Sequence, residues 1–177
     1  MVPDVMKLTL ELADREAIRD CLYRYCRGVD RCDEDMLHSA YWEDAHDDHV
    51  VFSGLREALI AWVIPLLRER EATSHTLSNI IIRLHGDGRA DCESYFQGYH
   101  VVRVDGRPRA NLQGGRYLDR LERRGGEWRI AARKVEVDWF REFADAGDWT
   151  TGPQGQSQIK PGGRYPQDAS YEFIDLN

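Results

Sequence analysis

The chain has 177 residues, 42% of them hydrophobic, and a formal net charge of −7 at pH 7. This length suffices for one domain with its own core, and the acidic balance argues against a nucleic-acid-binding protein. No run of 18 apolar residues occurs, and Met1–Val5 lacks the basic and apolar segments of a secretory signal. We therefore expect a cytoplasmic protein with no membrane or nucleic-acid partner.

Helices are predicted in the first part of the chain. Asp14 has the character of an N-cap for a helix that runs to about Val29. Within it, one apolar stripe is formed by Ile18, Leu22, Cys26 and Val29. A short helix is predicted over Met36–Trp42 and a longer one over Leu55–Arg70, kinked or restarted at Pro65.

From Ser74 onward the apolar period changes to that of strands. The predicted strands are Thr76–Leu84, Ala90–Val104, Ala110–Arg123 and Trp128–Phe140. Turn signals join them at His85–Gly88, Asp105–Pro108 and Arg124–Gly126. Gly114 and Gly115, in mid-strand, indicate a bend. Helices followed by a long antiparallel meander predict an α+β fold with the helices on one face of a curved sheet.

The end of the chain changes in composition. Arg141–Asn177 contains several Gly and Pro residues and has little periodicity. We therefore predict a single domain over residues 1–143 and an extended tail over 144–177. The tail should pack on the domain or on a neighbouring subunit, with anchors at Trp149, Tyr165, Tyr171, Phe173 and Ile174.

Several polar residues stand out against the apolar pattern. Tyr25 and Asp30 flank the stripe of the first helix, and an acid at a helix C-terminus is unfavourable with the helix dipole. Asp30 therefore has a partner or is a solvated loop residue. His100 interrupts an apolar strand face, as a functional group or as a satisfied core histidine. His75 stands where the helical region gives way to the sheet.

No metal or cofactor site is predicted. His46 and His49 lie close together, but alternation along an extended chain places them on opposite sides, and a set of three or four directed ligands is not evident. The sequence has no glycine-rich phosphate loop and no nucleophile elbow. The four cysteines have neither disulfide nor zinc spacing and are expected to be reduced and partly buried.

The pattern over Leu12–Phe143 resembles the nuclear transport factor 2-like superfamily, the cone-shaped α+β fold of SnoaL-like cyclases and several cofactor-free lyases. The resemblance rests on Ala17–Asp30, on Gly98–Val104, and on Gly126–Ile130 followed by Asp138–Trp139. The first segment is similar to hexachlorocyclohexane dehydrochlorinase and bile acid 7α-dehydratase. The second and third segments are similar to scytalone dehydratase.

This resemblance implies a catalytic set. It implies that Asp30 pairs with His75 at the start of the sheet, and that Tyr25 matches a catalytic tyrosine of the bile acid enzyme. His100 matches the second active-site histidine of scytalone dehydratase. Asp30 would orient His75 as a base, His100 would protonate or hold the departing oxygen, and Tyr25 would donate a hydrogen bond to developing negative charge.

The sequence departs from these enzymes at several positions. His49 stands where scytalone dehydratase has a tyrosine that helps to hold a water, and Gly115 and Tyr117 stand near its serine and asparagine. Asp47 falls near the active-site tryptophan of the dehydrochlorinase. The substrates of those enzymes therefore do not carry over to this chain.

We accordingly predict a cofactor-independent lyase, of dehydratase type, acting on a small hydroxylated, ring-containing substrate. Substrate contacts are expected from His49, Trp42, Phe96, Tyr117 and Trp139, although these aromatic residues are equally compatible with a structural core. The pattern is also compatible with a carbon–carbon lyase that releases formaldehyde from a diarylpropane-type diol, with an isomerase or cyclase, and with a non-catalytic binding module. Because related lyases trimerise through the outer sheet face, a homo-oligomer is expected, with a trimer preferred over a dimer.

Overall fold

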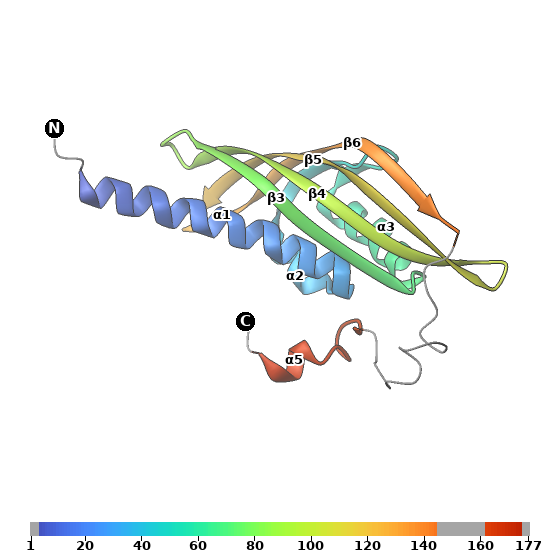
Figure 1. Cartoon of the computed structure of the whole chain (residues 1–177). Helices are drawn as coiled ribbons and strands as arrows, with labels where there is room; N and C mark the ends of the chain where they lie inside the picture. The colour runs from blue at the N-terminus through green and yellow to red at the C-terminus, as the bar shows by residue number, and fades with distance from the viewer. Residues whose placement is uncertain (1–3, 145–161, 175–177) are drawn as a thin grey trace.

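Helices precede most of the strands in the computed structural model, which describes residues 4–144 and 162–174 (Figure 1). The helices are α1 (Val5–Arg31), α2 (Glu34–Ala40), α3 (Arg56–Arg68) and α5 (Ser170–Phe173). The strands are β1 (Tyr41–Asp48), β2 (Ser53–Leu55), β3 (Ala72–Leu84), β4 (Arg89–Val104), β5 (Arg107–Arg124) and β6 (Glu127–Phe143). The predicted α+β class is confirmed.

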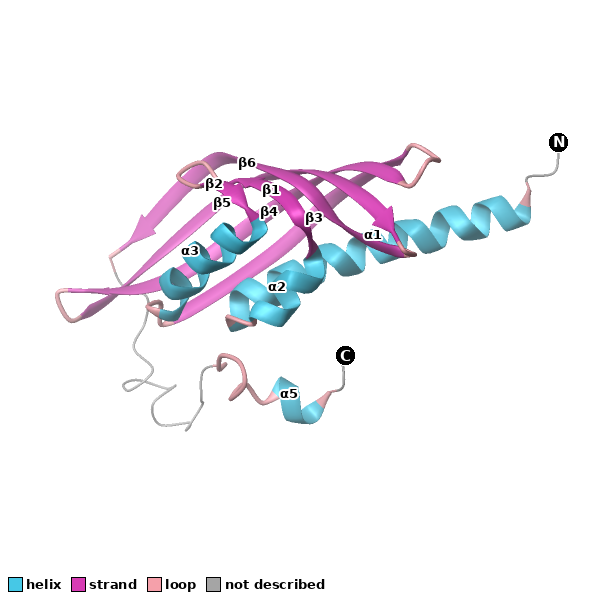
Figure 2. Cartoon of the chain, turned by 180° about the vertical axis from the view of Figure 1, so that it is seen from behind, coloured by secondary structure: helices cyan, strands magenta, loops and turns pink. Residues whose placement is uncertain are grey.

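The strands form one curved mixed sheet in the order β2-β1-β6-β5-β4-β3, with the helices on its concave side (Figure 2). The predicted meander is confirmed, because β3, β4, β5 and β6 pair antiparallel in sequence order. One pair outside the meander is parallel, that of β1 with β6. Strand β1 is far from β6 in the sequence, so no hairpin turn dictates the relative direction of these two strands.

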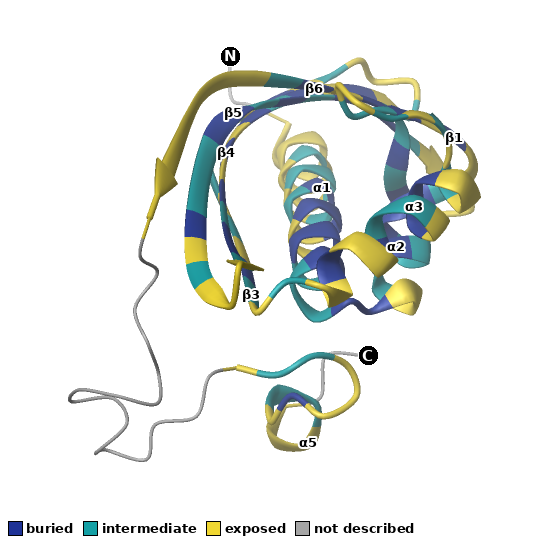
Figure 3. Ribbon diagram, turned by 90° about the vertical axis from the view of Figure 1, so that its right-hand side faces the viewer, coloured by how far each residue is buried: buried dark blue, intermediate teal, exposed yellow. Residues whose placement is uncertain are grey.

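The curvature has a local cause in β5 and β6. Their register shifts between Gly114 and Gly115, and a Cβ on Gly115 would lie only 1.9 Å from the carbonyl oxygen of Glu136. Only glycine permits this close approach of the two backbones. The predicted bend is therefore present as an irregularity in the pairing, and Figure 3 shows the sheet arching over α1.

Helix α1 begins earlier than predicted. Asp4 is its N-cap and accepts hydrogen bonds from the amides of Met6 and Lys7. Asp14 instead lies inside the helix, where it accepts from the indole N–H of Trp128 at 2.8 Å. The first turns of α1 are exposed, and the buried stripe begins only where the helix meets the sheet.

The predicted helix over Met36–Trp42 ends too late. Helix α2 stops at Ala40, and Trp42 lies in β1, a strand that the sequence analysis missed. The β1 segment is rich in acidic residues, which hides its alternation of buried and exposed positions. Helix α3 lies within the predicted range and includes Pro65.

The core lies between the helices and the concave face of the sheet. Its members include Ile18, Leu22, Leu37, Leu59, Leu121 and Ile130, all at most 1% exposed. The four cysteines are free and buried, as expected. No helix among the described residues combines the length and hydropathy needed to cross a membrane.

The described part of the tail, residues 162–174, contacts the C-terminal end of α1. The Tyr165 amide donates to the carbonyl of Arg31 at 2.7 Å, and the Tyr171 hydroxyl donates to Asp33 at 2.6 Å. The guanidinium of Arg27 lies 4.5 Å from the centre of the Tyr171 ring. The predicted anchor Trp149 lies outside the described residues.

Candidate active site

Asp30 and His75 are brought together by the contact between the end of α1 and the start of β3. Ring nitrogen Nδ1 of His75 lies 2.7 Å from Oδ1 of Asp30, and the main-chain amide of His75 donates to Oδ2 at 2.9 Å. An ionised carboxylate can only accept, so Nδ1 carries the shared hydrogen, and in the neutral form of the ring Nε2 is the nitrogen with the lone pair. This double contact explains an acid at an otherwise unfavourable helix end.

His100 lies beside His75 on the neighbouring strand. The two rings are 5.3 Å apart between centroids, at an interplanar angle of 70°. Gly98 pairs with His75 across β3 and β4, and a Cβ built on Gly98 would lie 3.4 Å from Nε2 of both histidines. The absence of a side chain at Gly98 therefore leaves open the space that both Nε2 atoms face.

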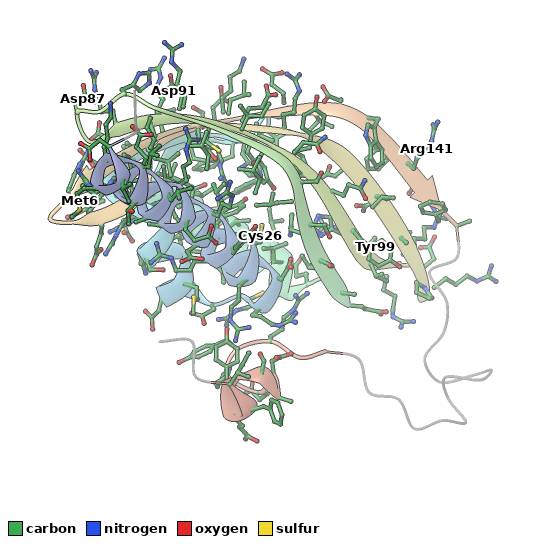
Figure 4. All side chains as sticks on the ribbon, turned by 60° about the vertical axis from the view of Figure 1, so that its left-hand side comes forward. Met6, Cys26, Asp87, Asp91, Tyr99 and Arg141 are labelled. Atoms are coloured by element: carbon green, nitrogen blue, oxygen red, sulfur yellow. The ribbon has the colours of Figure 1, made fainter. Side chains whose placement is uncertain are left out.

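A cavity of about 340 Å³ opens beside these two histidines. Its lining includes six of the residues predicted for the site: Tyr25, His49, His75, Phe96, His100 and Tyr117. Apolar side chains of α3 and β6, among them Trp62, Leu66 and Val135, complete much of the wall. Figure 4 draws the side chains between α1 and the sheet, with Cys26 labelled among them. A mostly apolar cavity with a few polar groups is typical of small-molecule sites.

Two predicted substrate contacts lie elsewhere. Trp42 donates its indole N–H to the carbonyl of Glu122 at 3.0 Å and lies against the guanidinium groups of Arg124 and Arg129. Trp139 lies close over Gly114, where an added Cβ would come within 2.3 Å of the indole ring. Neither tryptophan is among the cavity-lining residues. A register shift in β5 and β6 separates Trp139 from Val137, which does line the cavity.

Arg133 was missed by the sequence analysis. It is fully buried and forms two hydrogen bonds with the equally buried Asp119, at 2.7 and 2.8 Å. Its guanidinium carbon lies 4.1 Å from the ring centre of Tyr25 and 4.2 Å from that of Tyr117. If inward and outward side chains alternated along β6 from Trp128, Arg133 would point outward. A register shift in the pairing of β5 with β6 turns its side chain inward instead.

Burial sets the protonation of two site residues. It lowers the pKa of His100 to about 3, and the nearby charges of His75, Arg70 and Arg164 act in the same direction. His100 is therefore neutral near pH 7. Burial also raises the pKa of Tyr25, against the opposing effect of Arg133, so this phenol keeps its proton and can donate a hydrogen bond.

The tail reaches the back of the site through Arg164. Its guanidinium donates to the carbonyl of Asp30 and, at 3.2 Å, to the hydroxyl oxygen of Thr73. Thr73 pairs with His100 across the strands, with its Oγ1 3.4 Å from Nδ1 of that ring. Because the Thr73 hydroxyl accepts from Arg164, its own hydrogen is free to be donated to Nδ1 of His100. Nδ1 is then the acceptor nitrogen of the neutral ring, so Nε2 carries the hydrogen and faces the cavity.

His46 and His49, the two histidines near β1, do not lie together as ligands of one metal site would. His46 is exposed and its Nε2 lies 3.4 Å from Ser53, whereas His49 lines the cavity. Among the residues that the structure describes, no group of three or more His, Cys, Asp or Glu side chains is placed to hold a metal ion.

Comparison with known proteins identifies the family of this chain. The model of the SnoaL-like domain matches residues 10–134. The chain belongs to the SnoaL-like domain family. Its solved relatives of similar structure share the cone-shaped fold, which the sequence resemblance to the nuclear transport factor 2-like superfamily had implied.

Two such structures illustrate the similarity of this SnoaL-like protein to known folds. The hexachlorocyclohexane dehydrochlorinase LinA has a TM-score of 0.71 and 20% identity, over 81% of this chain and 97% of LinA. A protein of Novosphingobium aromaticivorans described as a candidate scytalone dehydratase has a TM-score of 0.66 and 21% identity, over 78% of this chain and 96% of the candidate dehydratase.

One curated relative of the SnoaL-like protein is named for a biosynthetic cluster. It is the terrestric acid biosynthesis cluster protein E of Penicillium crustosum, 28% identical over 153 residues. The match covers 81% of this chain and 92% of the relative.

Proposed function

We propose that the protein is a cofactor-independent lyase that eliminates water from a small, ring-containing β-hydroxy carbonyl compound. One observation carries the proposal: Asp30 orients His75 at 2.7 Å, and the free side of this imidazole faces an apolar cavity. His75 is 8% exposed at its side chain, so the paired ring is largely shielded from bulk water. Such a pair is suited to general base catalysis.

In the proposed reaction, Nε2 of His75 removes a proton from the carbon next to the carbonyl group. Asp30 stabilises the imidazolium that results, through the hydrogen bond to Nδ1. The electron pair of the broken C–H bond forms a carbon–carbon double bond as the C–O bond to the hydroxyl breaks. The departing oxygen takes up a proton and leaves as water, His75 then releases its proton to solvent, and neither an oxidant nor a reductant is consumed.

Hydrogen-bond donors in the cavity would stabilise the charge that develops on the carbonyl oxygen. Tyr25 is a neutral phenol at the cavity wall, and His100 presents Nε2–H as a neutral imidazole. In a mostly apolar cavity, one such donor contributes about 2.7–4 kcal/mol to transition-state stabilisation. The stacked rings of Phe96 and Tyr117, 4.4 Å apart, offer a flat surface for a ring-containing substrate.

The names of the relatives support this chemistry. Two proteins with the same fold are named for elimination reactions, a dehydrochlorinase and a candidate dehydratase. The cluster name of the Penicillium relative points to small-molecule metabolism. A SnoaL-like fold hosts other activities too, so the proposal rests on the side chains of the cavity.

The test uses 3-hydroxy-1-tetralone, a bicyclic ketone that becomes aromatic 1-naphthol when it loses water. We expect the wild-type protein to form 1-naphthol and His75→Gln to lose about 10²–10⁴-fold in turnover. His85→Gln is the matched control, because His85 also pairs with an aspartate, Asp91 at 2.9 Å, but at the surface and outside the cavity. Equal activity of both variants would contradict the assigned base.

The same measurements separate elimination from carbon–carbon cleavage and from binding alone. Release of formaldehyde from a diarylpropane-type diol, with no naphthol from the ketone, would replace dehydration by carbon–carbon cleavage. Binding of the ketone without turnover, detected by calorimetry, would replace the enzyme by a binding module.

A further inference from the structure

A second histidine–aspartate pair faces the same cavity. Nδ1 of His49 lies 3.0 Å from Oδ1 of Asp47, and the Tyr41 hydroxyl donates to the other carboxylate oxygen at 2.7 Å. Asp47 is fully buried, and the His49 side chain is 23% exposed at the cavity wall. The hydroxyl and the imidazole thus hold both oxygens of Asp47, so the carboxylate orients the ring of His49.

We propose that His49, oriented by Asp47, is the general acid that protonates the departing oxygen while His75 acts as the base. This inference rests on the proposed elimination and adds the residue that completes its proton balance. Asp47 does not line the cavity and is a positioning residue. His49 is the catalytic residue.

Asp47, the partner of His49, belongs to a row of buried charged residues. Asp47, Arg133 and Asp119 are partnered in register across β1, β6 and β5, and all three are buried. This row contains two carboxylates and one guanidinium, so one negative charge is uncompensated within it. Arg133 forms its two hydrogen bonds with Asp119, and the basic side chain that contacts Asp47 by a hydrogen bond is His49. A buried carboxylate needs such partners, so the pair with His49 is part of the structure of the site.

The backbone at His49 is held in an unusual turn. Its amide donates to the carbonyl of Phe52 at 2.7 Å, and Val50 has a φ of 65°. A β-branched residue in the left-handed region is a genuine outlier, and such strain concentrates at functional sites. The Trp62 ring lies edge-on to His49, with 5.9 Å between centroids. The turn and the tryptophan together direct the imidazole.

Two other histidines, one paired with an aspartate and one lining the cavity, are less suited to this role. The pair formed by His85 and Asp91 is short, but Asp91 is 58% exposed at its side chain and the pair is outside the cavity. His100 lines the cavity, yet burial lowers its pKa to about 3, so it is neutral near pH 7 and has no proton to give up readily. Its Nε2–H can only hold an oxygen by a hydrogen bond.

The two histidine–aspartate pairs together account for both proton transfers of the elimination. His75 takes the proton from carbon, the double bond forms, and the C–O bond breaks with its electron pair passing to oxygen. His49 gives its Nε2 proton to that oxygen, so that water rather than hydroxide departs. One histidine gains a proton and the other loses one, and exchange with solvent restores both.

The test compares two leaving groups on one skeleton, 3-hydroxy-1-tetralone and 3-acetoxy-1-tetralone. Acetate can leave as the free anion, whereas a hydroxyl group must be protonated so that it leaves as water. We expect His49→Gln to lose about 10²–10⁴-fold in turnover of the hydroxy ketone and little with the acetoxy ketone. His75→Gln should lose activity with both. His46→Gln is the matched control, since this exposed neighbour on β1 contacts Ser53 and is not part of the cavity wall.

Equal losses of His49→Gln on the two ketones, or no loss on either, would overturn the acid role while leaving the elimination intact. No turnover of either ketone by the wild-type protein would overturn the proposed function itself, and the acid role with it. Should His49→Gln unfold, nitrogen-15 NMR of the wild-type protein decides the point. An imidazolium at His49 near pH 7 supports the role, and a neutral ring contradicts it.

Discussion

Asp30 contacts His75 through both oxygens of its carboxylate, one at the ring and one at the main-chain amide. The aspartate therefore sets the position of the strand as well as the orientation of the ring. Both contacts form where α1 ends and β3 begins, and each depends on an oxygen acceptor.

Replacement of Asp30 by Asn should separate these two functions. An amide has only one oxygen, so either the ring or the main-chain amide of His75 meets an N–H group instead of an acceptor. We expect the fold to persist and kcat on 3-hydroxy-1-tetralone to fall by about 10²-fold or more, with a smaller change in KM. Steady-state kinetics measure this, with Asp91→Asn as the surface control. An unchanged kcat would contradict the orienting role.

Gly98→Ala tests the space between the two histidines. The added methyl group would lie 3.4 Å from Nε2 of His75 and of His100, which is an ordinary van der Waals contact. We therefore expect thermal stability close to that of the wild type, but turnover lower by on the order of 10²-fold, because the substrate is displaced from the base. Full activity of this variant would show that the substrate does not occupy this space.

Arg164→Ala tests the contact between the tail and the site. The guanidinium donates to three main-chain carbonyls, those of Asp30, Leu67 and Arg70, and to the Thr73 hydroxyl. Loss of these charge-assisted hydrogen bonds should lower the free energy of unfolding by about 1.5–3 kcal/mol. Urea denaturation measures the change. Arg164→Lys, which keeps the charge but not the planar donors, should recover only part of it, and an unaffected midpoint for both variants would contradict the contact.

The buried His100 should make stability depend on pH. Its folded-state pKa is about 3, below the ordinary 6.5, so the unfolded chain binds a proton that the folded chain does not. This contribution is present above pH 6.5 and is lost as the pH falls toward 3, at up to about 1.4 kcal/mol per pH unit. His75, Arg70, Arg164 and Thr73 surround the ring. Urea denaturation of His100→Gln should show a shallower loss of stability over this range than the wild type, and parallel curves would contradict the shift.

The outer part of β6 predicts self-association. Four of its side chains are apolar and between 41% and 51% exposed: Val137, Trp139, Phe140 and Phe143. Exposed apolar side chains gathered in one short segment are typical of an interface. We expect a homo-oligomer, with a trimer ahead of a dimer, and a lower mass for Phe140→Asp. Light scattering that finds the 20.5 kDa monomer for the wild type at micromolar concentration would rule this out.

The meander and the positions of Tyr25, Asp30, His75 and His100 could be predicted from the sequence, and the structure brings those four side chains together. The spacing of apolar residues shows which face of each segment is buried, and turn residues show where each segment ends. Both are local properties of the sequence. The family resemblance supplied the partner of Asp30, which no local pattern identifies.

Only the tertiary structure decided the rest of the site. The parallel pairing of β1 with β6 places Asp47 beside Arg133, and the register shift in β5 and β6 turns Arg133 inward. His49 joins the site through its contact with Asp47 and the turn at Val50. Strand register and direction are set by packing across the whole sheet, and a shift of one residue exchanges the two faces. Periodicity along one strand therefore cannot reveal which charged side chains meet inside the cone.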